Sequence, residues 1–150
     1  MLEIERKFLV KNTVRAVLNE KQPIRIAQCY LVNEKFKSVR IRIADNSAFL
    51  TIKNAASGIT RKEFEYEIPR NEAEDIVQTF DLKVLRKQRY QIMHNSKLWE
   101  VDVFGGRLQG LVLAEIELNA EDEKIQLPEW IDLEVTHDAS YLNANLINRL

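Results

Sequence analysis

The residues best suited to chemistry stand at the very start of the chain. Glu3, Glu5 and Lys7 occupy alternate positions, and Ile4 and Phe8 belong to the intervening apolar set. Alternate side chains of an extended strand point to opposite faces, so two carboxylates and an ammonium share one face. Burying three charges in an apolar core without partners is unfavourable. This face is therefore either solvated or wrapped around a ligand that is itself charged.

The same alternation recurs along the whole chain, as pairs of like charges two residues apart. An ordinary half-exposed strand would scatter Ser, Thr and Gln among its polar positions, whereas here nearly all of them carry full charges. The basic positions are Arg40, Arg42, Lys53, Lys87 and Arg89, with Arg61 as a further candidate. The acidic positions are Glu63, Glu65, Glu100, Asp102, Glu115 and Glu117.

These charges would form a site for a polyanion and metal ions if they all faced one interior. The cations suit a chain of phosphates, because Arg donates in a fork that matches phosphate oxygens and Lys supplies a point charge. The carboxylates would repel such an anion unless Mg²⁺ or Mn²⁺ lay between, since these ions bind carboxylate and phosphate oxygens together. Phosphoanhydride cleavage uses this combination of polyphosphate, metal ions and carboxylates.

Strands must position most of these side chains, since alternation of charged and apolar residues dominates the sequence. We expect strands at 2–10, 25–32, 38–44, 48–54, 61–68, 84–92, 98–104 and 111–119. Apolar residues at helical spacing predict a helix over 71–80, with Asn71 as its N-cap. A weaker helical pattern covers 12–19, and 141–150 is expected to form a last short helix.

Eight strands in hairpin order predict an α+β fold built on an eight-stranded antiparallel sheet. Closing the sheet into a barrel removes its edges, and a few helices would then pack outside. Eight strands leave an interior that is either filled or able to hold one small ligand. Periodicity alone favours an apolar interior with a charged coat, because charged residues are mostly exposed.

Length and composition predict a single soluble domain over residues 1–150. The net charge of −1 argues against non-specific nucleic-acid binding, which requires a basic excess. The single cysteine, Cys29, excludes an intrachain disulfide and favours a reducing compartment. Neither a leader pattern nor a membrane-spanning apolar run is present. We therefore expect a cytoplasmic protein without nucleic-acid or membrane partners, with a homodimer left open.

The order of the charged motifs resembles that of the CYTH family, the triphosphate tunnel metalloenzymes. Glu3–Phe8 looks like the family's Glu-x-Glu-x-Lys signature, and seven further segments follow in the family's order. They are Val39–Arg42, Leu50–Lys53, Arg61–Glu65, Lys87–Tyr90, Trp99–Phe104, Ala114–Glu117 and Glu134–Thr136. One departure is Gln28-Cys29-Tyr30, where the family usually has Gln-Gly-Tyr. We expect the small Cys29 to face away from the lumen and the site to be retained.

The resemblance implies a tunnel with its charges inside, which reverses the orientation that periodicity favours. By motif, the triphosphate would be bound by Lys7, Arg40, Arg42, Lys53, Lys87 and Arg89. Mg²⁺ or Mn²⁺ would be held by Glu3, Glu5, Glu115 and Glu117, with Glu63, Glu65 and Asp102 as further ligands or water-mediated partners. The residues implied to be catalytic are Glu3, Glu5, Lys7, Lys87 and Glu117.

The resemblance implies an enzyme most similar to the bacterial inorganic triphosphatases. Its substrate would be inorganic tripolyphosphate, hydrolysed to pyrophosphate and orthophosphate by in-line attack of a metal-activated water. A nucleoside triphosphatase, a thiamine triphosphatase or an adenylate cyclase would use the same tunnel, but no aromatic cluster marks a pocket for an organic group. A non-catalytic polyphosphate or nucleotide sensor is the alternative from another class. The presence of Glu3, Glu5, Glu115 and Glu117 favours catalysis.

Several residues have a structural interpretation in preference to a chemical one. His94 and His137 are expected at the surface, and Trp99 and Trp130 are expected to pack helices on the outside of the barrel. Tyr30 either points into the tunnel or packs against its neighbours. Glu134 either orients an arginine in the tunnel or caps the closing segment.

Overall fold

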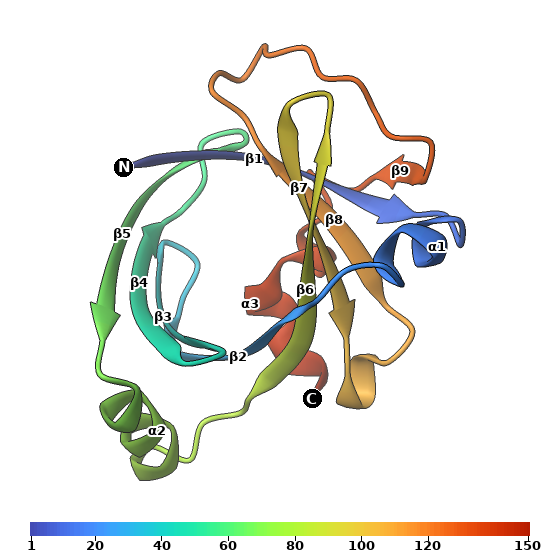
Figure 1. The fold of residues 1–150 in the computed structure, drawn as a ribbon. Helices are drawn as coiled ribbons and strands as arrows, with labels where there is room; N and C mark the ends of the chain where they lie inside the picture. Colours follow the sequence, from blue (N-terminus) through green and yellow to red (C-terminus); the bar gives the residue numbers. More distant parts are fainter.

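The strands of the protein form a closed antiparallel barrel, seen along its axis in the computed structural model, which describes residues 1–150 (Figure 1). The barrel expected from the sequence is therefore confirmed. Its strands are β1 (Leu2–Val10), β2 (Ile24–Asn33), β3 (Lys37–Ala44), β4 (Ser47–Asn54), β5 (Thr60–Ile68), β6 (Leu85–His94), β7 (Lys97–Phe104) and β8 (Val112–Glu117).

Strand β1 closes the barrel by pairing with two strands in succession. The sheet order is β5-β4-β3-β2-β6-β7-β8-β1, and β1 also pairs with β5 through Leu2 opposite Lys62. Farther along β1, Glu5 lies opposite Glu117 and Lys7 lies opposite Glu115 of β8. A short ninth strand, β9 (Ile131–Glu134), pairs with the last part of β1. The sequence did not predict β9, because four residues are too few to establish a period of two.

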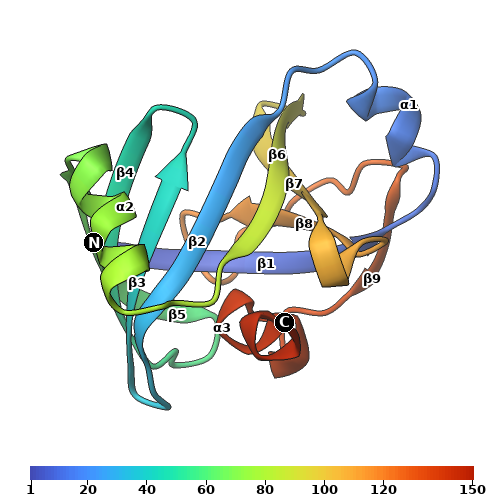
Figure 2. The ribbon, with the colours of Figure 1, turned by 90° about the horizontal axis from the view of Figure 1, so that it is seen from below.

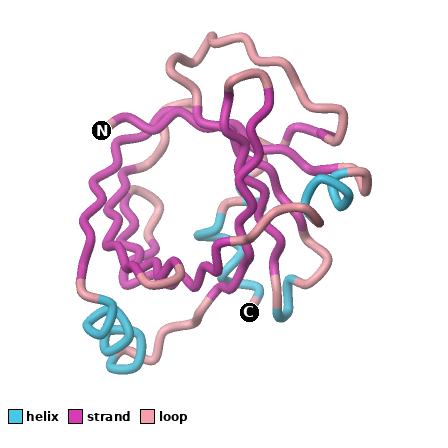
Figure 3. Tube along the Cα trace, viewed as in Figure 1, coloured by secondary structure: helices cyan, strands magenta, loops and turns pink.

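The helices are short, and two of them lie outside the ring of strands (Figure 3). The α-helices are α1 (Val14–Leu18), α2 (Arg70–Thr79) and α3 (Asn143–Leu146). Three-residue 3₁₀ turns occur at Gly106–Leu108, Ala139–Tyr141 and Ile147–Arg149. No helix has the length and apolar character needed to cross a membrane.

The predicted N-cap of α2 was wrong, because Pro69 caps the helix and Asn71 lies in its first turn. A proline disfavours helical backbone in the residue before it, so Ile68 stays extended and ends β5. The helix then begins at once with Arg70.

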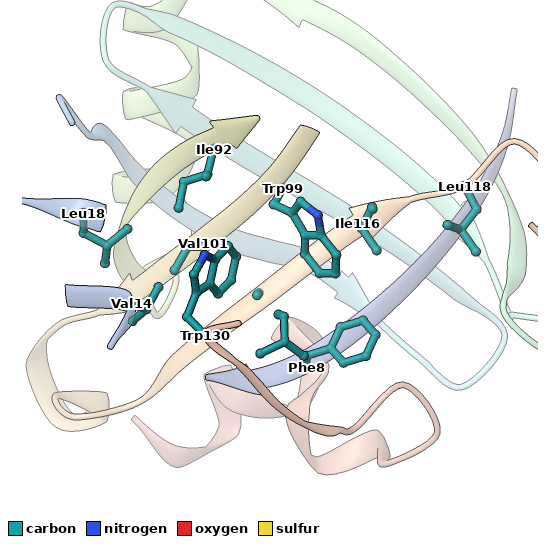
Figure 4. Packing of buried hydrophobic residues seen from close by; sticks show 11 residues of the cluster. Phe8, Val14, Leu18, Ile92, Trp99, Val101, Ile116, Leu118 and Trp130 are labelled. Carbon is teal, nitrogen blue, oxygen red and sulfur yellow. The ribbon is translucent and has the colours of Figure 1, made fainter. Parts of the chain in front are cut away.

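The main apolar core lies outside the barrel, where Trp99 packs between other aromatic rings (Figure 4). Its ring centroid lies 5.5 Å from that of Phe8 and 5.8 Å from that of Trp130. Val14 and Leu18 of α1 join this cluster. The expected packing of both tryptophans on the outer face is confirmed.

A second outer cluster lies under α2, and it holds the cysteine. Cys29, Ile41 and Ala48 of β2, β3 and β4 pack with Ala73 of the helix. Cys29 is buried there, with its neighbours Gln28 and Tyr30 on the cavity side of the same strand. Because α1 and α2 cover these apolar faces, the barrel can turn its charged faces inward.

The C-terminal segment packs at one end of the barrel (Figure 2). Towards this end the inward positions change from charged to apolar, and Leu85 and Leu113 follow Lys87 and Glu115 at a spacing of two. Leu146 of α3 is fully buried against them. The interior is therefore a cavity with an apolar end wall.

Candidate active site

The inward positions converge on one cavity of about 340 Å³. It is lined by the cations Lys7, Arg40, Arg42, Lys53, Arg61, Lys87 and Arg89. It is also lined by the carboxylates Glu3, Glu5, Glu63, Glu65, Glu100, Glu115 and Glu117. The apolar interior that periodicity favoured was wrong. Every charged residue singled out for the site lines the cavity, except Asp102.

Asp102 lies behind the cavity surface, where it is fully buried between two cations. One of its oxygens accepts from Lys87 Nζ at 2.6 Å and from Arg89 Nη2 at 2.8 Å, and the other accepts from Arg89 Nε at 2.7 Å. Burial opposes its ionisation, but Lys87 and Arg89 outweigh burial and lower the pKa of Asp102. Both carboxylate oxygens are thus engaged, which does not fit the metal-ligand role expected for this residue.

Glu115 completes an ion-pair network on strands β6, β7 and β8, called here the β6–β8 wall (Lys87, Arg89, Asp102 and Glu115). Its two oxygens lie 3.2 Å from Lys7 Nζ and 3.3 Å from Arg89 Nη2. Burial opposes ionisation of Glu115, yet Lys7 and Arg89 lower its pKa well below the ordinary value. The cations of this wall are therefore neutralised and held in place by the protein itself.

Glu5 and Glu117 differ from Glu115, because neither forms an ion pair with a cation of the cavity. They lie opposite each other on β1 and β8. Burial, and then the charge of Glu115, raises the pKa of Glu5 to about 8. Burial, and then the charges of Glu3 and Glu100, raises the pKa of Glu117. For each carboxyl, burial and neighbouring acids therefore outweigh the nearby lysines, which would favour its ionised form.

This pair of acids fits the binding of a divalent cation. Carboxylate oxygens are the donors that Mg²⁺ and Mn²⁺ prefer, and a cation beside Glu5 would favour its ionised form. Glu115 lies next to Glu117 along the inner face of β8 and, unlike Asp102, lines the cavity, although its two oxygens are paired with Lys7 and Arg89. No three His, Cys, Asp or Glu side chains are already arranged around a single metal position.

On β1 and β5, the carboxylates Glu3 and Glu63 share one lysine. Lys53 Nζ lies 2.8 Å from Glu3 and 3.7 Å from Glu63. Burial opposes ionisation of Glu3, but Lys53 outweighs burial and lowers its pKa. The pKa of Glu63 is instead raised by burial and by the charge of Glu3.

Strands β2 and β3 present a different surface, called here the β2–β3 wall (Gln28, Tyr30, Arg40 and Arg42). Both arginines share Glu65, which lies 3.8 Å from Arg40 and 3.2 Å from Arg42. Burial, and then the charge of Arg40, lowers the pKa of Arg42. The Nε groups of both arginines are buried without a hydrogen-bond partner in the protein. This wall therefore carries more positive charge than its one carboxylate balances, and it has hydrogen-bond donors that the protein leaves unpaired.

The structure also decides the residues whose roles the sequence left open. Glu134 binds the guanidinium of Arg6 through two hydrogen bonds of 2.7 and 2.8 Å, on the face opposite the cavity. It therefore joins β9 to β1 and orients no arginine of the tunnel. Tyr30 lines the cavity, whereas neither histidine does. His137 is exposed and His94 is partly exposed at the end of β6.

Two uncharged polar lining residues, Ser38 and Asn143, were not predicted from the sequence. Ser38 could have been found, because it continues the alternation of Arg40 and Arg42 along β3. Asn143 had no such signal, since it reaches the cavity only when α3 folds across the end of the barrel.

The fold and site define a class: closed antiparallel barrels whose charged lumen is suited to polyphosphate and divalent cations. Residues 1–150 match the family model described as CYTH domain. The chain therefore belongs to the CYTH family.

Relatives with described activities share nearly the whole chain. It is 42% identical to an inorganic triphosphatase of Acetivibrio thermocellus over 146 residues, which cover 97% of this chain and 92% of that protein. It is 33% identical over 150 residues to an inorganic triphosphatase of Nitrosomonas europaea, with 97% of each chain covered. A solved structure of an inorganic triphosphatase aligns with a TM-score of 0.65 at 30% identity, covering 97% of this chain and 93% of that one.

Proposed function

We propose that this protein is an inorganic triphosphatase that hydrolyses tripolyphosphate to pyrophosphate and orthophosphate with Mg²⁺ or Mn²⁺. The observation that carries the proposal is the cavity itself, in which seven lysines and arginines face seven carboxylates within about 340 Å³. The similarity to inorganic triphosphatases over 97% of the chain supports the same reaction.

The phosphates are bound by the cations that the lumen brings together. Arg40 and Arg42 share one carboxylate between them, so they retain donors for phosphate oxygens. The other members of this set are Lys7, Lys53, Lys87 and Arg89. Asp102 acts as a positioning residue, because it fixes the side chains of Lys87 and Arg89 from behind.

The carboxylates without cation partners hold the metal. Glu5 and Glu117 provide oxygens from two adjacent strands, and Glu115 and Glu3 lie beside them on the same inner faces. Glu63 and Glu65 are placed to act as further or water-mediated partners from β5. When bound, Mg²⁺ or Mn²⁺ would supply a water of lowered pKa and would neutralise charge on the phosphates. Lys7 and Lys87 would hold the phosphates in line for attack.

The cavity favours a bare polyphosphate over a substrate with a large organic group. Tyr30 is the one aromatic residue among those that line it, and the C-terminal segment packs at one end. A nucleotide base or a thiamine ring would need a stacking or apolar pocket, which these residues do not provide. We therefore consider hydrolysis of tripolyphosphate a better fit than hydrolysis of nucleoside or thiamine triphosphates or cyclisation of ATP. A non-catalytic sensor is disfavoured, because all the carboxylates suited to metal face the cavity.

Phosphate release tests this function directly. Tripolyphosphate, ATP and thiamine triphosphate are compared side by side with Mg²⁺, with Mn²⁺ and with EDTA. We expect metal-dependent hydrolysis with tripolyphosphate at least about tenfold faster than ATP, which corresponds to roughly 1.4 kcal/mol of transition-state discrimination. Equal rates would contradict the substrate choice, and binding without hydrolysis under all conditions would favour the sensor.

The remaining expectations concern the state of the protein in the cell. We propose that residues 1–150 act as one CYTH domain in the cytoplasm, without nucleic-acid or membrane partners. The buried free thiol of Cys29 is in keeping with a reducing compartment. Sedimentation analysis of the purified chain would decide whether it forms a homodimer.

A further inference from the structure

Gln28 is a buried polar residue without a partner in the protein. Its residue exposure is 1%, and neither its amide nitrogen nor its amide oxygen meets a hydrogen-bonding group of the chain. Buried amides are almost always paired, because leaving one unpaired costs much of its hydration energy. Gln28 lines the cavity, so the cavity's contents, either solvent or ligand, are the available source of a partner.

The neighbours of Gln28 show the same excess of unpaired donors. Arg42 lies opposite Gln28 in the pairing of β2 with β3, and Arg40 lies opposite Tyr30. The Nε groups of both arginines are likewise buried without a partner. On the β6–β8 wall, by contrast, every side-chain polar group is engaged with another residue. Asn143 Oδ1 of α3 is one further unpaired acceptor among the lining residues, and all the unpaired donors that line the cavity lie on β2 and β3.

We propose that Gln28 is a substrate-binding residue whose side-chain NH₂ donates to an oxygen of the bound triphosphate. This inference rests on the proposed function and assigns one contact within it. Gln28 is suited to this position because its amide donates without adding charge beside Arg40 and Arg42, which already repel each other. A lysine at the same place would increase that repulsion.

The proposal differs from a purely structural role in what a substitution would do. A structural amide that binds internal water would stabilise the ligand-free protein, so its loss would lower the melting temperature. A substrate-binding amide contributes mainly when the anion is present. Replacing it with an apolar residue of the same shape would then be neutral or stabilising in the ligand-free protein.

The test is Gln28→Met in the full chain, with Gln88→Met as the matched control. Gln88 is exposed on the outer side of β6, so the same chemical change occurs away from the cavity. Affinity for tripolyphosphate is measured in EDTA by calorimetry and by the rise in melting temperature, and KM and kcat are measured with Mg²⁺. We expect Gln28→Met to weaken binding and raise KM by about tenfold or more, since bonds to charged groups are strong. Its ligand-free melting temperature should match or exceed that of the parent, and the control should match the parent throughout.

A lower ligand-free melting temperature together with parental affinity and KM would overturn the proposal and make Gln28 structural. If Gln28→Met does not fold, the side-chain amide resonances of Gln28 in the ¹⁵N-labelled parent provide the second measurement. Tripolyphosphate should shift them, and unchanged resonances at saturating ligand would also overturn the proposal. If the parent binds tripolyphosphate without hydrolysing it, the proposed function fails while the Gln28 contact is still tested by affinity. If it neither binds nor hydrolyses it, both fail.

Discussion

The β6–β8 wall and the β2–β3 wall both present cations to the cavity, yet the protein pairs the cations of the two walls to different extents. Lys87 and Arg89 are held by Asp102 through hydrogen bonds of 2.6 to 2.8 Å. Arg40 and Arg42 share Glu65 at longer distances, and their Nε groups have no partner. The first wall is therefore fixed before a ligand arrives, whereas the second keeps donors free for it. A polyanion site needs both, because fixed charges orient the ligand and free donors bind it.

The largest effect should come from removing the anion that fixes the β6–β8 wall. Asp102→Asn keeps the shape of the side chain but leaves Lys87 and Arg89 buried without their shared countercharge. We expect the free energy of unfolding to fall by about 3–5 kcal/mol, as measured by urea denaturation. Glu100→Gln is the control, because Glu100 also pairs with Arg89 but is about one-third exposed (33%). It should change stability by less than about 1 kcal/mol. Equal stabilities of the two variants would mean that the wall is not held by Asp102.

A substitution in the β2–β3 wall should reduce substrate use and leave the fold intact. Arg42→Ala removes a proposed phosphate-binding group and also relieves its repulsion with Arg40. We expect kcat/KM for tripolyphosphate to fall by the equivalent of about 1.5–3 kcal/mol, with unfolding free energy unchanged or raised. Steady-state kinetics test the fall in kcat/KM, and urea denaturation tests the unfolding free energy. Arg25→Ala is the control, because Arg25 is exposed outside the cavity. A destabilised variant with parental kinetics would remove the distinction between the walls.

The smallest effect on stability should come from Glu117, the acid at the end of β8 that has no cation partner. Its pKa is raised above the ordinary 4.5, first by burial and then by Glu3 and Glu100. The folded state therefore binds a proton more tightly than the unfolded state. Stability is lost as pH rises from about 4.5 until the folded-state pKa is passed. Glu117→Gln does not show this loss of stability, so the ligand-free variant should be as stable as the parent or slightly more stable near pH 7, the gain being small because Glu117 is exposed to solvent.

If Glu117 is a metal ligand, adding metal should make the parent more stable than Glu117→Gln. Mg²⁺ or Mn²⁺ should raise the melting temperature of the parent more than that of Glu117→Gln, because binding to the folded state stabilises it. Hydrolysis should be largely lost in the variant, and Glu129→Gln, in an exposed loop, should behave as the parent. A variant that melts well below the parent without metal and retains full activity would instead make Glu117 a structural residue.

The sequence predicted the strands well, because alternate charges leave an unmistakable period of two on β1, β3, β5 and β8. It did not distinguish Asp102 from Glu100, since both lie on the inner face of β7. The difference lies in the neighbours on β6: Arg89 lies opposite Asp102, and Arg89 and Lys87 together engage both oxygens of Asp102, which does not line the cavity. Such neighbours depend on the register of adjacent strands, which a single strand's periodicity does not encode.

Local sequence patterns also could not predict which face of the strands points inward, or which segment packs at the end of the barrel. The alternation of Lys87 with its neighbours is the same whether the charges face inward or outward. What decides the matter is the apolar cover supplied by Trp130, α1 and α2, segments remote in sequence from the strands they cover. For the same reason Asn143 could not be assigned to the site before α3 was seen across the end of the barrel.

The apolar end wall formed by Leu85, Leu113 and Leu146 has a consequence for the order of events in a reaction cycle. If this wall prevents passage, substrate and products share the other opening, and the fragment nearer that opening departs before the deeper one can follow. The deeper fragment then determines how soon the next substrate binds, and it should act as the stronger product inhibitor. A phosphate chain longer than the cavity would be held by one terminus, with its other end in solvent, and could be shortened only from that terminus.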